Sequence, residues 1–280
     1  MRFIDLSKLP IPTEWRDEER HLLDELAGMS RKDRSEAFKK EKYRVWALWS
    51  RLLEGLSYGK CWYSEFRVTG AAGDVDHFRP KNKVAKEDAP EGHDGYWWLG
   101  ILLSNFRFCC QLSNRRMEDE ETGEIQGKGT RFPLFDRNTR ARHSTDHLDR
   151  EQPLLLDPTV ESDSELLWFN QDGSVSSRNP DKNSADYRRV EASRLCYHLD
   201  DIDIRTKRGA ACAEVKRIAE TLEELETEVA GGNGDARRKL IERKIKLFEM
   251  TREYAEFSAA ARATLKAYDY IPSAKEVLSS

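Results

Sequence analysis

The spacing of apolar residues changes abruptly along this chain of 280 residues, and this change constrains its fold. Residues 32–56 carry apolar side chains at three- and four-residue steps, which predicts one long helix. Residues 60–158 lose this periodicity and are rich in Gly, Pro, Asn and Asp, with a turn expected at 70–73. The last third returns to helical spacing. We therefore expect an α+β fold that is mostly helical.

Helical segments are expected at both ends of the chain. In the last third we predict helices at 184–199 and 212–229, then a long helix beyond the glycine-rich break at 231–234. The apolar stripes on these helices are interpreted as the core of a helical hairpin, whereas an exposed stripe would be a partner surface. The predicted organisation has three parts: 1–57, an N-terminal helical segment; 58–160, a central domain; and 161–280, a C-terminal helical region.

Composition limits the classes of function. The chain has 47 basic and 51 acidic residues, so any nucleic-acid site must be a local basic patch or must be completed by a partner. No apolar run approaches the roughly 20 residues that span a bilayer, and residues 1–6 lack the long apolar stretch of a signal peptide. Five irregularly spaced cysteines do not form a disulfide framework. We expect a cytoplasmic protein without a membrane partner.

Two polar clusters carry the chemistry that the sequence indicates. Asp76 directly precedes His77, and Asn105 and Asn114 follow further along the chain. A carboxylate and an amide oxygen suit a hard divalent cation such as Mg²⁺ or Mn²⁺, so Asp76 and Asn114 are the candidate metal ligands. An imidazole titrates near neutral pH, which makes His77 the candidate general base. Asn105 is expected to fix the loop that supplies a backbone carbonyl to His77. The set suits metal-assisted cleavage of a phosphodiester.

The order and spacing of these residues resemble the HNH endonuclease family, a branch of the ββα-metal nucleases. The resemblance lies in Asp74-Val75-Asp76-His77, in Asn105, and in Asn114-Arg115 nine positions later. It implies a two-stranded ribbon that carries Asp76 and His77, and a helix that begins near Ser113 with Asn114 in its first turn. The 28 positions from His77 to Asn105 are a longer insert than the family pattern, which a loop tolerates.

The resemblance extends over residues 58–160. The segments 61–65, 77–81 and 151–158 are similar to a subgroup of HNH proteins from bacterial anti-phage systems of the Septu type and from some retron systems. It implies an HNH nuclease module embedded between the two helical segments, acting on DNA as the expected target. It also implies a protein partner, an ATPase of the ABC/SMC-like kind.

The chain departs from the family at its cysteines. Many HNH proteins hold a structural Zn²⁺ with two Cys-x-x-Cys pairs, but here the pairs begin at Cys61 and Cys110 and end in Ser64 and Ser113. Serine hydroxyls are poor zinc ligands, so structural Zn²⁺ is not expected. Cys61 and Cys110 are the candidate residues of a residual zinc site. Cys109 would supply a third thiol ligand if zinc were bound there.

Basic residues surround the two polar clusters in the sequence. The residues expected to contact nucleic acid are Arg79, Lys81, Arg107, Arg115 and Arg116. Two alternatives stay open at this point. One is a degenerate HNH adaptor that binds nucleic acid or the ATPase without cutting, which the lost thiols favour. The other is a nuclease that acts on structured RNA such as tRNA, because the same metal chemistry cleaves either backbone.

Overall fold

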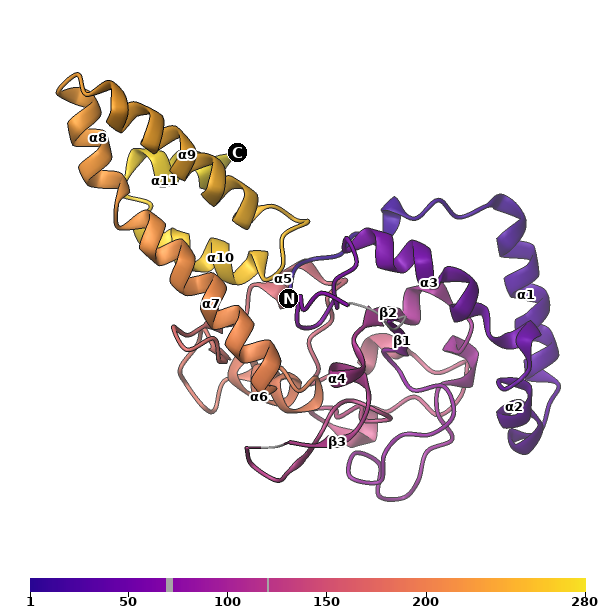
Figure 1. Ribbon diagram of the computed structural model, residues 1–280. Helices are drawn as coiled ribbons and strands as arrows, with labels where there is room; N and C mark the ends of the chain where they lie inside the picture. Colours follow the sequence, from indigo (N-terminus) through magenta and orange to yellow (C-terminus); the bar gives the residue numbers. More distant parts are fainter. Residues whose placement is uncertain (69–72, 120) are drawn as a thin grey trace.

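The computed structural model describes residues 1–68, 73–119 and 121–280 as an α+β fold that is mostly helical (Figure 1). The turn expected at 70–73 lies, except for Gly73, outside the described residues. Three two-stranded antiparallel sheets lie in the middle of the described chain. The expectation of helical ends around a central part with short strands is therefore confirmed for these residues. The predicted boundaries at 57 and 160 remain predictions.

The N-terminal part is a set of helices packed on the central strands. Its helices are α1 (Thr13–Ala27), α2 (Arg31–Ala37) and α3 (Val45–Leu56). The prediction of one helix over 32–56 was wrong, because α2 ends at Ala37. Residues 39–42 read Lys-Lys-Glu-Lys and offer no apolar face to bury, while Tyr43 turns inward and donates its hydroxyl to Glu25 Oε2 at 2.7 Å.

Short elements follow one another through the central part. They are β1 (Asp74–His77), β2 (Phe106–Cys109), α4 (Gln111–Asn114), β3 (Met117–Glu118), β4 (Ile125–Gln126), α5 (Glu161–Ser164), β5 (Leu167–Phe169) and β6 (Val175–Ser177). The pairs are β1 with β2, β3 with β4, and β5 with β6. An isolated antiparallel bridge between Lys60 and Arg67 precedes β1.

The C-terminal part contains the longest helices. They are α6 (Ala185–Cys196), α7 (Ile202–Ala219), α8 (Leu222–Ala230), α9 (Gly234–Thr251), α10 (Ser258–Leu265) and α11 (Pro272–Ser279). The helix predicted at 184–199 is confirmed as α6, which Ser184 caps. Figure 1 shows α7 to α11 extending away from the rest of the molecule, and we call these five helices the arm. Within the described ranges, no helix combines the length and apolar character that crossing a membrane requires.

Two long helices predicted in this region are each split in two. The helix expected at 212–229 breaks between Ala219 and Leu222, and the later one ends at Thr251 and resumes at Ser258. At the second break the buried Lys60 ammonium donates to the carbonyls of Glu253 at 2.5 Å and Ala255 at 2.8 Å. These bonds satisfy backbone groups that the interrupted helix leaves free.

Three clusters of buried apolar residues form the core. One joins α1 and α3 to the β1–β2 ribbon and includes Leu26, Trp49 and Phe106. The second lies under the central loops, and the third fills the arm between α7, α9, α10 and α11. Most of the apolar stripes on the arm helices are thus core residues, as expected, whereas Ile241, Ile245, Phe248 and Tyr254 are exposed. The ribbon lies where the first two clusters meet, so it is supported on both faces.

A buried carboxylate joins the arm to the central part. Glu65 accepts hydrogen bonds from Ser258 Oγ and from the Ala259 N–H at the start of α10, each at 3.0 Å. The same carboxylate lies 3.6 Å from the Lys60 ammonium and 3.9 Å from the Met1 amino group. Three segments that are distant in sequence therefore converge on Glu65.

Candidate active site on the β1–β2 ribbon

The antiparallel ribbon of β1 and β2 positions the first polar cluster. In its register Asp76 lies opposite Arg107 and His77 opposite Phe106. All four β2 residues are buried, and Phe106 and Phe108 anchor the ribbon in the core that it shares with α1 and α3. The ribbon that was expected to carry Asp76 and His77 is therefore present, with α4 directly after its second strand.

Hydrogen bonding fixes the protonation of the His77 ring. Its Nε2 lies 2.9 Å from the carbonyl oxygen of Gly100, and because a carbonyl only accepts, Nε2 carries the proton. The neutral ring then presents an unprotonated Nδ1, which lies 3.3 Å from Lys81 Nζ. Burial, and then the Lys81 charge, lower the pKa of His77 well below 6.5. At neutral pH His77 is therefore an uncharged base.

Asn105 supports this arrangement from the other end of the insert. Its side-chain oxygen accepts the Arg79 N–H at 2.8 Å, and its amide donates to the carbonyls of Arg79 at 2.9 Å and Leu99 at 3.2 Å. The loop that supplies the Gly100 carbonyl is thus tied to the turn after His77. Asn105 is buried and fixes the loop, as the sequence predicted, through Leu99, the residue before Gly100.

Asp76 is buried and accepts two hydrogen bonds. Tyr63 donates its hydroxyl to Oδ2 at 2.6 Å, and Lys128 Nζ lies 2.9 Å from Oδ1. Lys128 also donates to the His77 carbonyl at 2.8 Å, and its side chain has no exposed surface. Sequence reasoning missed Lys128. A lysine between two glycines, Gly127 and Gly129, is a pattern typical of an exposed turn and gives no sign of a buried ion pair.

The backbone of 127–129 packs against the end of α4, which explains these two glycines. A Cβ at Gly127 would lie 2.0 Å from the Arg115 carbonyl oxygen. The N–H groups of Lys128 and Gly129 bond the carbonyls of Ser113 and Asn114, which ends α4 after one turn. The helix expected near Ser113 is thus present but begins two residues earlier, at Gln111, and Asn114 lies at the end of its single turn.

Asn114 faces the same part of the surface as Asp76. Its Nδ2 donates to Asp74 Oδ2 at 3.1 Å, which leaves its carbonyl Oδ1 directed elsewhere. That oxygen accepts no hydrogen bond from any residue that the structure describes. Each Asp76 oxygen keeps a further lone pair beyond its single bond. The donor set of Asp76 and Asn114 therefore fits a hard cation such as Mg²⁺ or Mn²⁺.

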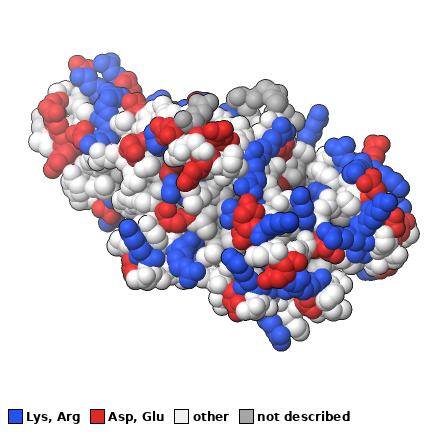
Figure 2. All heavy atoms as spheres, turned by 90° about the horizontal axis from the view of Figure 1, so that it is seen from below, with Lys and Arg blue, Asp and Glu red and all other residues white. Residues whose placement is uncertain are grey.

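A groove of about 570 Å³ brings the candidate residues together. Asp76, His77 and Asn114 line it together with four cations, which are Lys81, Lys83, Arg115 and Arg116. Asp76 is the only carboxylate among the lining residues. On the wider surface acidic and basic side chains are interspersed, as Figure 2 shows for one face. The groove is thus a local basic site on an acidic protein.

Two of the predicted nucleic-acid contacts do not line this groove. Arg107 is buried, and its guanidinium bonds both Asp157 oxygens at 2.6 and 2.7 Å, so the expectation that it contacts a phosphate was wrong. A strand residue facing the core can hold a charge only with such a partner. Arg79 is partly buried and donates to Glu151 Oε2 at 2.8 Å. Both arginines stabilise the scaffold of the site.

The residual zinc pairs meet in a buried cluster. Cys61 Sγ lies 3.7 Å from Ser113 Oγ, Cys110 Sγ lies 3.4 Å from the same hydroxyl, and Ser64 Oγ lies 4.0 Å from Cys110 Sγ. The hydrogen bond with Cys61, together with burial, raises the pKa of the Cys110 thiol. Across the described part of the chain, no three His, Cys, Asp or Glu side chains form a metal-binding group. Two thiols and two hydroxyls replace the four ligands of the family pattern.

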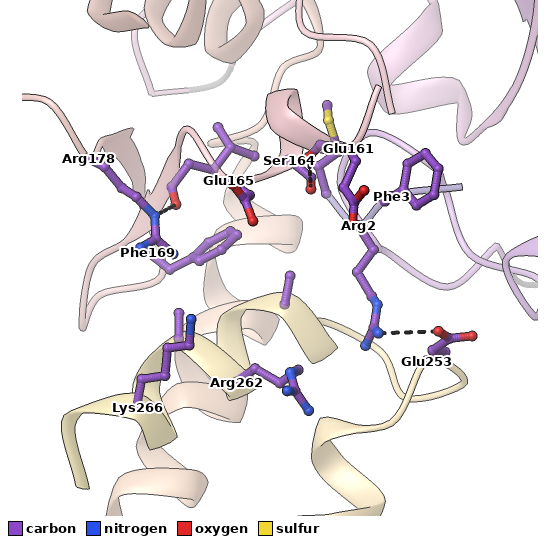
Figure 3. Close-up of a pocket in the computed structure, with 14 residues that line it drawn as sticks. Arg2, Phe3, Glu161, Ser164, Glu165, Phe169, Arg178, Glu253, Arg262 and Lys266 are labelled. Atoms are coloured by element: carbon purple, nitrogen blue, oxygen red, sulfur yellow. Dashed lines mark hydrogen bonds and ion pairs between the residues drawn. The ribbon is translucent and has the colours of Figure 1, made fainter. Parts of the chain in front are cut away.

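A larger cavity lies elsewhere in the described chain. It measures about 660 Å³ and lies between the N-terminus, residues 161–178 and α10 (Figure 3). Arg262 and Lys266 lie across it from Glu161 and Glu165, and Arg2 pairs with Glu253, so its charges are mixed. It contains no base positioned like His77. We therefore place the candidate active site in the smaller groove, on the chemistry of its side chains rather than on its size.

Comparison with known proteins adds no assignment. No family model matches the chain, and no curated protein matches it.

Proposed function

We propose that this protein is a metal-dependent HNH endonuclease that hydrolyses phosphodiester bonds of nucleic acid, with DNA as the expected target. The observation that carries the proposal is the His77 ring. Its Nε2 proton is held by the Gly100 carbonyl, and its unprotonated Nδ1 lies 3.3 Å from Lys81 Nζ; His77 and Lys81 line the same groove as Asp76 and Asn114. A neutral, oriented imidazole beside hard oxygen donors is suited to activating water.

The succession of elements supports the same proposal. A two-stranded ribbon followed by a short helix is the arrangement implied by the resemblance to ββα-metal nucleases. Here β1 supplies Asp76 and His77, and α4 supplies Asn114. Asn105, at the position that the resemblance assigns to loop ordering, bonds the backbone on both sides of the insert.

Each side chain has a defined role in the proposed reaction. Asp76 and Asn114 would hold Mg²⁺ or Mn²⁺, which neutralises charge on the phosphate and on the leaving oxygen. His77 accepts a proton from the attacking water at Nδ1, while Nε2 keeps its proton on Gly100. Lys83, Arg115 and Arg116 contact the flanking phosphates, and such contacts set affinity and register but not sequence preference.

The biological setting is part of the proposal. From the resemblance over 58–160 we infer a cytoplasmic nuclease effector of a bacterial anti-phage system that acts with an ABC/SMC-like ATPase. A chain with a net acidic charge and one local basic groove is compatible with a partner that helps to hold the substrate. RNA such as tRNA remains the alternative target, because no residue of the groove identifies the sugar.

One observation favours the second candidate, a degenerate adaptor that binds nucleic acid or the ATPase without cutting. Lys128 forms an ion pair with Asp76, the carboxylate that would hold the metal. The adaptor and the nuclease share the basic groove and differ in whether His77 is used. They therefore predict equal binding of nucleic acid and opposite results for cleavage.

The test is cleavage of supercoiled plasmid DNA and of tRNA by the purified chain with Mg²⁺, Mn²⁺ or chelator. His77→Ala should lower the cleavage rate about 10²–10⁴-fold, the usual contribution of a general base. His143→Ala, which removes an exposed histidine, is the control and should cut like the wild type. Equal cutting by His77→Ala and the wild type would contradict the nuclease proposal. Binding without metal-dependent cutting by any variant, with or without the ATPase, would support the adaptor.

A further inference from the structure

The charge balance of the groove is unusual for a site that would bind a dication. Among the lining residues one carboxylate, Asp76, lies with four cations. Asp74, the neighbouring carboxylate, is paired with Arg115 at 3.2 Å. A divalent cation approaching this groove alone therefore meets a field that is positive rather than negative.

Lys128 contributes most to the positive potential of the groove, because its ammonium lies directly beside Asp76. Its ammonium is 2.9 Å from Asp76 Oδ1, and its side chain has no exposed surface. Water cannot screen a buried charge, so its repulsion of a nearby cation is stronger than that of a surface lysine. The Asp76 carboxylate is thus already neutralised before any metal arrives.

The fold prevents Lys128 from moving aside. Its Nζ also donates to the His77 carbonyl at 2.8 Å, and its backbone N–H is bonded to Ser113. Gly127 and Gly129 adopt positive φ angles of 95° and 51° and let this segment lie against α4. The ammonium is therefore a fixed part of the site.

We propose that Lys128 keeps the Asp76–Asn114 site free of metal until a phosphodiester occupies the groove, so that the divalent cation and the nucleic acid bind together. This inference rests on the proposed function and adds a mode of regulation to it. A phosphate brings one negative charge, which offsets the positive charge of the groove, and an oxygen ligand in addition to those of Asp76 and Asn114. The protein alone would bind the divalent cation weakly, and tight binding of the cation would require bound nucleic acid.

The inference predicts a gain of binding on mutation, which structural damage would not produce. Lys128→Met removes the charge and keeps the length of the side chain. The free variant should bind Mn²⁺ at least about tenfold more tightly than the wild type, because a buried positive charge near the ion is lost. Lys128→Gln, which keeps a hydrogen-bond donor, should shift affinity in the same direction and serves if Lys128→Met does not fold.

The experiment measures Mn²⁺ affinity by calorimetry or by electron paramagnetic resonance of free Mn²⁺. All proteins carry His77→Ala, so that bound duplex DNA is not cut. With Lys128 present, a short duplex should tighten Mn²⁺ binding at least about tenfold, and in Lys128→Met this effect should be much smaller. Lys83→Met is the matched control, since it removes a groove cation that does not touch Asp76, and it should change Mn²⁺ affinity less.

Two results would overturn the inference. One is a folded Lys128→Met that binds Mn²⁺ no more tightly than its parent. The other is a parent protein whose Mn²⁺ affinity is the same with and without duplex. Failure of the proposed function is distinguishable, because it would appear as absent cleavage by the His77-containing protein even where Mn²⁺ binding follows the predicted order.

Discussion

Replacing Arg107 by methionine should lower the free energy of unfolding by about 3–5 kcal/mol, because it leaves a buried carboxylate without its partner. The guanidinium makes five hydrogen bonds. They go to both oxygens of Asp157, to Thr159 Oγ1, and to the carbonyls of Ser104 and Phe106. Its side chain is 3% exposed and that of Asp157 is 14% exposed, so little solvent is available to compensate.

The pH dependence of stability follows from the same pair. Burial raises the pKa of Asp157, but the Arg107 charge and hydrogen bonds outweigh it, and the pKa lies below 3.8. The pair therefore contributes stability that is complete above pH 3.8 and is lost as the pH falls through the folded pKa. In Arg107→Met that contribution is absent, and the difference between variant and wild type should shrink in acid.

Urea unfolding followed by circular dichroism at pH 7 measures this effect. Arg115→Met, which breaks an exposed ion pair with Asp74, is the control and should change stability by no more than about 1 kcal/mol. The double variant Arg107→Met/Asp157→Asn should recover part of the loss, because no unpaired charge is then buried. An Arg107→Met protein with wild-type stability and weakened DNA binding would refute the reasoning and restore Arg107 as a phosphate contact.

Three further outcomes are expected. Asn105→Ala should lower stability by about 2–4 kcal/mol through its three lost backbone hydrogen bonds, and should also slow cleavage, as unfolding and plasmid assays would show. Burial lowers the pKa of Lys81 to about 8, so DNA affinity measured by fluorescence anisotropy should fall as the pH rises through 8, and this step should be missing in Lys81→Gln. Because the folded pKa of His77 lies below 6.5, its contribution to stability is complete above 6.5 and is lost as the pH falls below it. His77→Ala should therefore show a shallower loss of unfolding free energy between pH 6.5 and 5.

The ribbon was predicted from the resemblance to HNH nucleases, and the candidate base from a local motif. Asp76 and His77 are adjacent in the sequence, and Asn105 and Asn114 were identified by their spacing from this pair. The structure brings His77, Asp76 and Asn114 to one groove and gives Asn105 the loop-fixing position expected of it. Helical periodicity likewise located most of the helices. These features depend on side chains that are close in sequence.

What could not be predicted depends on contacts between distant segments. Lys128 lies 52 positions from Asp76, and nothing in Gly-Lys-Gly indicates that the lysine is buried. Arg107 belongs to a strand whose burial is decided by Asp157 and by the helices packed on it. The break after Thr251 depends on the ammonium of Lys60, nearly two hundred residues earlier. Local sequence patterns do not predict contacts between residues that are so far apart in the sequence.

The convergence of three segments on Glu65 has a mechanical consequence. Tyr63, whose hydroxyl holds Asp76, lies two residues from this carboxylate, and the carboxylate is bonded to the first turn of α10. A force that displaces α10 therefore pulls on the short stretch of chain that steadies the acid of the groove. The arm and the groove are therefore linked through Glu65, and the Lys60 bonds to the carbonyls of Glu253 and Ala255 reinforce the same junction.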